Sequence, residues 1–236
     1  MTESSLLTAL TQNVEYRVLL AAGSAFVIAI LFGSRFISWL GRRGMLEQTT
    51  KGDSAHLDTL HGHKADTPTM GGVIFLVAAG VATLLWAKLD SSMVLMLLGY
   101  TLAFGAIGLV DDLVKLGPGS KKGIRGRTKF FYQCALGISA GCLLYWYPPV
   151  VHLASAADPA TTLSLPFFKD AGFSLGILYI PLVCIVLAGS SNAVNLADGL
   201  DGLAAGCSVL VGVTFVVVAL LAGSSDASSL LRIPHV

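Results

Sequence analysis

Charged residues are scarce in this sequence, and their scarcity indicates the class of protein. Only 12% of the 236 residues are Asp, Glu, Lys or Arg, whereas a soluble domain usually has about 25%. Hydrophobic residues make up 54%, and the mean hydropathy is +0.76. We therefore expect an integral membrane protein. The net charge of +1 gives no general attraction to nucleic acid, which is not an expected partner.

A signal peptide and a cysteine framework are also missing. The first sixteen residues contain Glu3 and Glu15 but no Lys or Arg, which is the wrong charge for the start of a signal peptide. The first apolar stretch should therefore remain as a helix. Four cysteines lie in apolar stretches without any C-x-x-C pair, which supports neither a disulfide framework nor a zinc site. We interpret them as small apolar filler: Cys134, Cys142, Cys184 and Cys207.

Long apolar stretches are what the sequence has instead. A membrane helix needs roughly 17–25 predominantly apolar residues. Six stretches reach this length, and none contains Lys, Arg, Asp or Glu: residues 18–34, 71–87, 93–110, 130–147, 173–190 and 203–222. The predicted fold class is therefore all-α, a polytopic membrane protein with about six transmembrane helices. We expect a single membrane domain over residues 1–236.

The basic residues between these stretches predict an orientation in the membrane. Segments 41–70 and 111–129 hold ten of the fifteen Lys and Arg residues. They follow the first and third expected helices, so they lie on the same side, and the positive-inside rule makes that side cytoplasmic. Segment 191–202 returns to the same side. The N-terminus is then expected outside.

The first of three polar clusters precedes the second apolar stretch. Lys64 stands before the run TPTMGG at residues 67–72. Threonine hydroxyls and free backbone amides at a helix start can bind an anion. The alternative, a Thr-Pro helix start followed by a Gly-Gly packing contact, stays open on spacing alone.

The second cluster is the pair Asp111 and Asp112 at the expected end of the third helix. Adjacent carboxylates repel each other, and at a helix C-terminus they also face the negative end of the helix dipole. A nearby cation, either a metal ion or Lys115, would relieve this. Carboxylates at membrane depth often mark functional sites. The alternative is a solvated helix end beside basic residues.

The third cluster, NAVNLADGLDG at residues 192–202, combines amides and carboxylates. Asp198 and Asp201 are three residues apart, so they share one face if the segment is helical. A hard divalent cation favours carboxylate and amide oxygens. The alternative is a polar turn that caps the sixth helix.

The three clusters together predict phosphate chemistry at a membrane surface. They bring four carboxylates, two amides and several Lys and Arg residues to one side of the bilayer. Carboxylates can hold Mg²⁺ while basic residues neutralise the phosphates of a diphosphate–metal complex. The spacing of the residues does not identify the substrate.

Four stretches resemble the polyprenyl-phosphate sugar-phosphate transferase superfamily, and most closely its bacterial phospho-N-acetylmuramoyl-pentapeptide transferase family. They are Lys64 with TPTMGG (67–72), GLVDDLVK (108–115), GIRGRTKFFYQ (123–133) and NAVNLADGLDGLAAG (192–206). Of these, TPTMGG favours this family over relatives that transfer N-acetylglucosamine phosphate.

The resemblance implies a reaction and its partners. Phospho-N-acetylmuramoyl-pentapeptide is transferred from its UDP carrier to undecaprenyl phosphate, which gives lipid I and UMP in peptidoglycan synthesis. Mg²⁺ is the implied cofactor, and membrane lipid surrounds the protein. The implied location is the bacterial inner membrane with a cytoplasmic site, and the resemblance is compatible with a homodimer.

The same resemblance implies roles for ten residues. The implied catalytic residues are Asp111, Asp112, Asp198 and Asp201, of which the last two are also the expected metal ligands. The implied substrate-binding residues are Lys64, Thr69, Lys115, Lys129, Asn192 and Asn195.

The sequence departs from the family in one residue and in length. Asp66 stands where the family usually has Gly before TPTMGG. The family has roughly ten helices, and its later part supplies another aspartate, which is thought to hold Mg²⁺, and a histidine-rich loop. Neither occurs here, so we expect a fragment truncated at the C-terminus.

Three other functions remain alternatives. A related transferase could use a different UDP-N-acetylhexosamine. A truncated homologue could be inactive and bind only lipid or partner helices. A transporter or channel is disfavoured because a conducting path places polar groups near the midplane, whereas these expected helices carry no charge.

Overall fold

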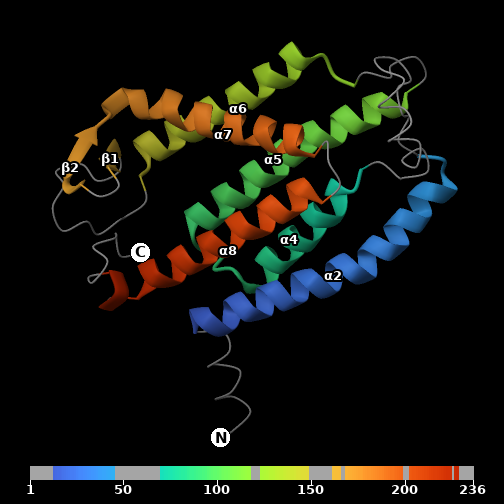
Figure 1. The fold of residues 1–236 in the computed structure, drawn as a ribbon, viewed down its shortest axis with the longest axis horizontal. Coiled ribbons are helices and arrows are strands. Elements are labelled where there is room, and N and C mark those ends of the chain that lie inside the picture. The colour runs from blue at the N-terminus through green and yellow to red at the C-terminus, as the bar shows by residue number, and fades with distance from the viewer. Residues whose placement is uncertain are drawn as a thin grey trace, which may run out of the picture. The chain divides into compact units, whose positions relative to one another are not determined.

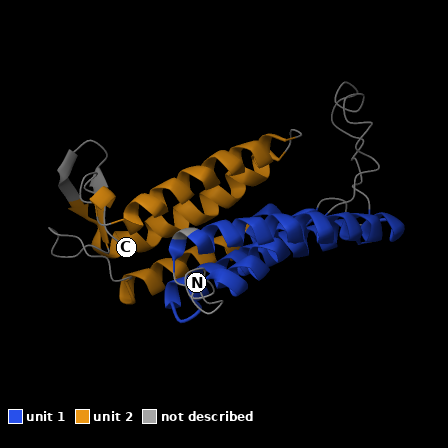
Figure 2. Cartoon of the chain, turned by 90° about the horizontal axis from the view of Figure 1, so that it is seen from below, with its two compact units in different colours: residues 1–129 blue, residues 130–236 orange. Residues whose placement is uncertain are grey.

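The computed structural model describes residues 13–45, 70–117, 123–148, 161–165, 168–198, 202–224 and 226–228. The chain divides into two compact units, Met1–Lys129 and Phe130–Val236, coloured blue and orange in Figure 2. The single membrane domain expected from the sequence stays a prediction.

Six α-helices of fifteen or more residues occur among the described residues, and each overlaps one of the predicted apolar stretches. They are α2 (Val14–Arg42), α4 (Gly72–Trp86), α5 (Ser92–Leu116), α6 (Gly126–Trp146), α7 (Tyr179–Ala197) and α8 (Leu203–Gly223) (Figure 1). The α2, α5, α7 and α8 helices are long and apolar enough to cross a membrane, and α4 is a shorter apolar helix. The all-α, polytopic membrane fold class is confirmed, whereas the expected number of transmembrane helices stays a prediction, because four of the described helices meet the requirements for a span.

Several helices extend beyond the apolar stretches that predicted them. The first was expected over residues 18–34 but runs from Val14 to Arg42. The third continues past residue 110 to Leu116 and so includes both aspartates of the second cluster. Hydropathy marks where a chain is apolar, whereas a helix continues as long as its backbone hydrogen bonds can form. Part of each predicted polar loop is therefore helical.

The fifth helix begins later than predicted. Residue 173 was expected to begin it, but Phe173 lies in strand β2 (Phe168–Ser174), which pairs antiparallel with β1 (Thr162–Leu165). A short 3₁₀ turn, η3 (Gly176–Leu178), leads into α7. Pro181 is the third residue of α7, within the first turn, where a missing N–H breaks no helical hydrogen bond.

Unit 1 packs α4 against both α2 and α5 (Figure 1). The buried positions of α4 are Ala78 and Ala82, so small side chains bring the helices together. At the C-terminal end of α4, the Arg17 guanidinium donates to the Trp86 carbonyl, and the Trp86 indole donates to Ser24 Oγ at 3.1 Å. A cation at this position complements the helix dipole.

Unit 2 packs α6 closely against α7. A Cβ atom added at Gly137 would lie 2.8 Å from Cys184 Cα, and one added at Gly141 would lie 2.9 Å from Ile180 Cα. Such close backbone approach through glycine is typical of membrane helix pairs. All four cysteines are free, and the Cys184 thiol donates to the Cys134 carbonyl at 3.6 Å.

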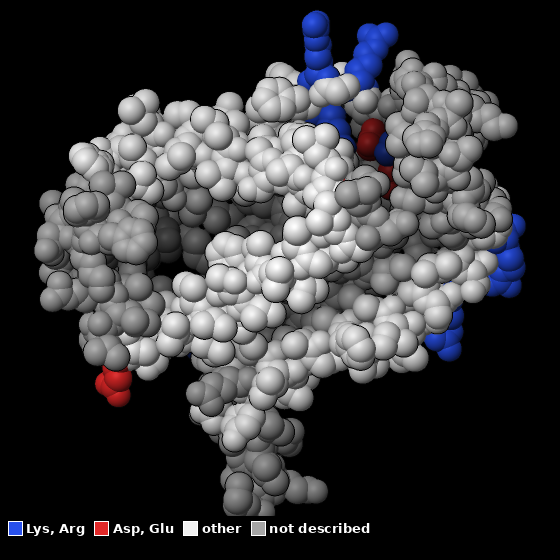
Figure 3. All heavy atoms as spheres, in the orientation of Figure 1, with Lys and Arg blue, Asp and Glu red and all other residues white. Residues whose placement is uncertain are grey.

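The described surface is largely apolar. Figure 3 shows mostly uncharged side chains, with the charged ones gathered in a few places. Large apolar side chains are exposed on helices of both units, including Phe26, Phe75, Leu97, Val209 and Phe215. A soluble protein rarely exposes so much contiguous apolar surface, whereas lipid solvates such side chains.

Candidate functional site

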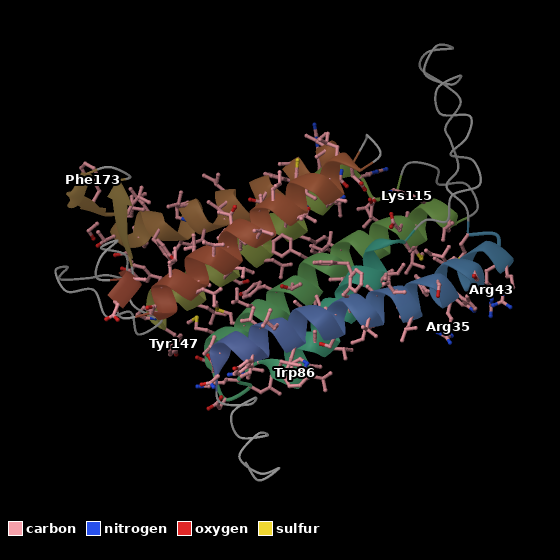
Figure 4. The ribbon with its side chains drawn as sticks, turned by 60° about the horizontal axis from the view of Figure 1, so that its bottom comes forward. Arg35, Arg43, Trp86, Lys115, Tyr147 and Phe173 are labelled. Carbon is pink, nitrogen blue, oxygen red and sulfur yellow. The ribbon has the colours of Figure 1, made fainter. Side chains whose placement is uncertain are left out.

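Two carboxylates lie side by side in the second-last turn of α5. Asp111 and Asp112 are followed on the same helix by Lys115, whose Nζ lies 3.1 Å from Asp111 Oδ2 and 3.0 Å from Asp112 Oδ1. Residues three and four positions apart on a helix face each other. Lys115 is therefore the cation that relieves the expected repulsion between the two carboxylates. Figure 4 labels Lys115 at this end of α5.

Two further donors reach Asp111 from residues that follow α5. The backbone N–H of Ile124 donates to Oδ1 at 2.8 Å, and Lys129 Nζ, in the first turn of α6, lies 3.5 Å from Oδ2. Asp111 is only 8% exposed. Both of its oxygens are thus occupied in a buried setting, as a buried carboxylate requires.

Asp112 has different surroundings from its neighbour. Its side chain is 30% exposed, and within the described ranges Lys115 is its one ionic partner, through Oδ1. Its second oxygen accepts no hydrogen bond from a described residue. The pair therefore consists of one fixed, buried carboxylate and one partly open carboxylate.

An amide network joins α6 to α7 in unit 2. Asn192 Nδ2 donates to Gln133 Oε1 and to the Ala188 carbonyl, each at 2.8 Å. Gln133 Nε2 donates in turn to Ser191 Oγ at 3.0 Å, and Gln133 is 1% exposed. Gln133 was not among the predicted site residues, although a lone amide inside the apolar stretch 130–147 is a signal for a functional residue.

The remaining residues of the third cluster surround the end of α7. Asn195 lies in the last turn of the helix, and Asp198 is its exposed C-cap residue. Gly202, at φ +79°, precedes α8 in the left-handed conformation that glycine adopts readily. Asp201 lies outside the described residues, so the face that Asp198 and Asp201 were expected to share stays a prediction.

The first cluster is described only at its end. Lys64 and Thr69 lie outside the described residues. Met70 has φ +70°, the only positive value among the described non-glycine residues, and it is buried. Such a backbone conformation costs about 1–3 kcal/mol and occurs often at functional sites.

Comparison with known proteins identifies the family. The sequence profile of glycosyl transferase family 4 matches residues 94–233, which is more than half of the chain. The chain belongs to glycosyl transferase family 4. The first phospho-N-acetylmuramoyl-pentapeptide-transferase signature also matches, over residues 64–76. The family 4 profile and this signature together cover all ten predicted site residues, and the resemblance drawn from the four motifs is confirmed.

One curated relative extends the likeness over almost the whole chain. The phospho-N-acetylmuramoyl-pentapeptide-transferase of Desulforapulum autotrophicum is 37% identical over 227 residues. The aligned region covers 96% of this chain and 60% of the relative. This family 4 chain therefore spans less than two thirds of the length of that relative.

Proposed function

We propose that this protein transfers phospho-N-acetylmuramoyl-pentapeptide from UDP to undecaprenyl phosphate and forms lipid I and UMP. The observation that carries the proposal is the Asp111–Asp112 cluster in a chain that also matches the transferase signature at residues 64–76. The cluster contains the buried Asp111 carboxylate and the partly exposed Asp112 carboxylate, beside the ammonium groups of Lys115 and Lys129. Phosphoryl transfer needs this kind of positioning and charge neutralisation more than covalent chemistry by the protein.

The two carboxylates suit different tasks in this reaction. Asp112 has an open oxygen that can accept a proton from the lipid phosphate or orient it for attack. Asp111 is buried and holds Lys115 and Lys129 in place. These ammonium groups would neutralise the phosphates of the two substrates. These are the tasks of a one-step transfer, whereas a two-step reaction through a covalent aspartyl-phosphate would make one of the two aspartates the nucleophile.

Other residues would bind the UDP-sugar. Asn192 uses its amide nitrogen within unit 2, and no described residue donates to its carbonyl oxygen, which can accept a hydrogen bond from the nucleotide. The remaining proposed substrate-binding residues are Lys64, Thr69 and Asn195.

Mg²⁺ is the proposed cofactor, with Asp198 and Asp201 as its protein ligands. Among the described residues, no three His, Cys, Asp or Glu side chains converge on one point. Mg²⁺ is usually held by one or two carboxylates together with substrate phosphates. The exposed carboxylate of Asp198 at the end of α7 is an oxygen donor of this kind. When bound, the ion would neutralise the diphosphate.

The proposed location is the bacterial inner membrane, with the site on the cytoplasmic side and the N-terminus outside. Within unit 1, Arg35, Arg43 and Lys115 lie toward one end and Trp86 lies toward the other (Figure 4). The three labelled cations at one end, against Arg17 beside Trp86 at the other, support the positive-inside assignment. Assembly as a homodimer rests on the family resemblance alone.

The alternatives differ in what they predict for the sugar nucleotide. The signature at residues 64–76 favours the muramoyl substrate over another UDP-N-acetylhexosamine. A transporter is disfavoured because α5 carries charge only in its last six residues. An inactive homologue would bind lipid without releasing UMP.

A substrate comparison tests the proposal. The 236-residue chain, in detergent with phospholipid, undecaprenyl phosphate and Mg²⁺, would receive either UDP-N-acetylmuramoyl-pentapeptide or UDP-N-acetylglucosamine. We expect UMP release with the first nucleotide, and none when the lipid phosphate is omitted. Equal release with both nucleotides would support the related transferase, and no release with either would support the inactive homologue.

A further inference from the structure

We propose that Gly123 and Ile124 form a positioning turn that fixes the Asp111 carboxylate, and that only glycine at position 123 allows this turn to dock. The effect of the turn on catalysis rests on the function proposed above. The turn itself touches no substrate, so Gly123 and Ile124 are positioning residues.

Two independent features require glycine at position 123. Its φ is +67°, in the left-handed region that side chains disfavour. A Cβ atom at this position would overlap Asp111 Oδ1 and would lie 3.0 Å from Lys115 Cε. The Asp111 carboxylate and the Lys115 side chain therefore occupy the space that a side chain at position 123 would need.

The close approach at Gly123 brings the next backbone amide onto the carboxylate. Ile124 N–H donates to Asp111 Oδ1 at 2.8 Å, across thirteen residues of sequence. Because Oδ1 is held in this way, Oδ2 is left to face Lys115 on α5 and Lys129 on α6, at 3.1 and 3.5 Å. The turn thus fixes the rotamer of Asp111, and Asp111 in turn fixes both ammonium groups.

The turn contacts Asp111 but not the neighbouring residue Asp112 among the contacts of the described residues. Asp112 pairs with Lys115 alone among the described residues, and no contact with the turn involves it. A buried carboxylate that loses a donor bears a large desolvation cost, so Asp111 depends on the turn more than Asp112 does. This difference makes the inference testable at two adjacent residues.

Gly126 offers a matched control for Gly123. It lies three residues further on, begins α6 and has no unusual φ, and a Cβ atom there would meet nothing within 4 Å. Gly123→Ala and Gly126→Ala therefore add the same methyl group close together in sequence, but only the first should displace Asp111.

The first readout is a zero-length carbodiimide cross-link between Asp111 and Lys129, measured by peptide mass spectrometry on the full chain in detergent. We expect the cross-link in the unaltered chain and in Gly126→Ala, and a decrease of about tenfold or more in Gly123→Ala, because a hydrogen bond to a charged group is lost. Equal cross-linking in the two variants would overturn the inference.

The second readout does not depend on how well Gly123→Ala folds. Hydrogen exchange at the Ile124 amide should be slow in the unaltered chain and should accelerate in Asp111→Ala but not in Asp112→Ala. Fast exchange in the unaltered chain, or acceleration in both variants, would mean that Asp111 does not hold the turn.

Kinetics connect the turn to the proposed function. In the UMP-release assay, Gly123→Ala should lower kcat by about tenfold or more and should also raise KM, because the turn holds the proposed substrate-binding residues Lys115 and Lys129 through Asp111. Gly126→Ala should leave both constants unchanged. If the unaltered chain releases no UMP, the proposed function fails, while the cross-link and exchange results still decide the turn. If it releases UMP and Gly123→Ala matches Gly126→Ala, the inference fails alone.

Discussion

Asp111 and Asp112 are adjacent in sequence but differ in what surrounds them. The spacing of Lys115 three and four residues later was readable from the sequence, because helical neighbours follow a fixed period. The contacts from Ile124 and Lys129 were not readable, because they depend on how the segment after α5 returns to it. For the same reason the sequence predicted both aspartates as catalytic but did not distinguish their surroundings.

The two carboxylates should also differ in their contributions to stability. Asp111→Ala removes the partner of three donors in a buried setting, and we expect a loss of about 1.5–3 kcal/mol in the free energy of unfolding. Asp112→Ala breaks one partly exposed ion pair and should cost about 0–1 kcal/mol. Thermal unfolding of both variants in detergent measures the difference. Equal shifts in Tm would contradict the assignment of Asp111 as the fixed carboxylate.

At the scale of elements, hydropathy predicted where helices occur but not where they end. Each of the six apolar stretches overlaps a helix, and four of these helices are long and apolar enough to cross a membrane, where the backbone must satisfy its own hydrogen bonds. The β1–β2 hairpin and the late start of α7 were missed. Phe173 is as apolar as the residues of the helix that follows, so hydropathy does not separate it from that helix. It lies in a strand because it pairs with Leu163, ten residues earlier in the sequence.

Close packing of α6 on α7 gives a prediction at this scale. Gly137→Ala places a methyl group 2.8 Å from the Cys184 backbone and should cost about 1–3 kcal/mol through overpacking. Gly212→Ala, in the middle of α8, meets nothing within 4 Å and should be neutral or stabilising because alanine favours helix. Tm values of the two variants check this, and a Gly137→Ala variant as stable as Gly212→Ala would show that the helices do not pack this closely.

For the whole molecule, the family was predictable from motifs because they combine residue types with fixed spacing. Family membership is shown, whereas the activity is a proposal, since the chain covers 60% of the relative's length. The predicted roles of Lys64, Thr69 and Asp201 concern residues outside the described part of the chain. Their placement stays a prediction of the resemblance.

The orientation of the whole molecule can be tested by labelling. In a chain whose four native cysteines are replaced by serine, Arg43→Cys and Lys88→Cys would be exposed to a membrane-impermeant maleimide in intact cells. The positive-inside assignment predicts that position 88 reacts from outside and that position 43 reacts only after permeabilisation. The reverse pattern would place the Asp111–Asp112 cluster outside and would rule out access to a cytoplasmic nucleotide.

The most direct test of the central claim is UMP release by the chain with either aspartate of the cluster replaced. We predict that Asp111→Asn and Asp112→Asn each lower kcat/KM by about 100-fold or more, because acid–base and positioning groups contribute at least that much. Asp90→Asn, an exposed acid in the turn between α4 and α5, is the control and should stay within about twofold of the unaltered chain. If both cluster variants release UMP as fast as Asp90→Asn does, the cluster is not the active site.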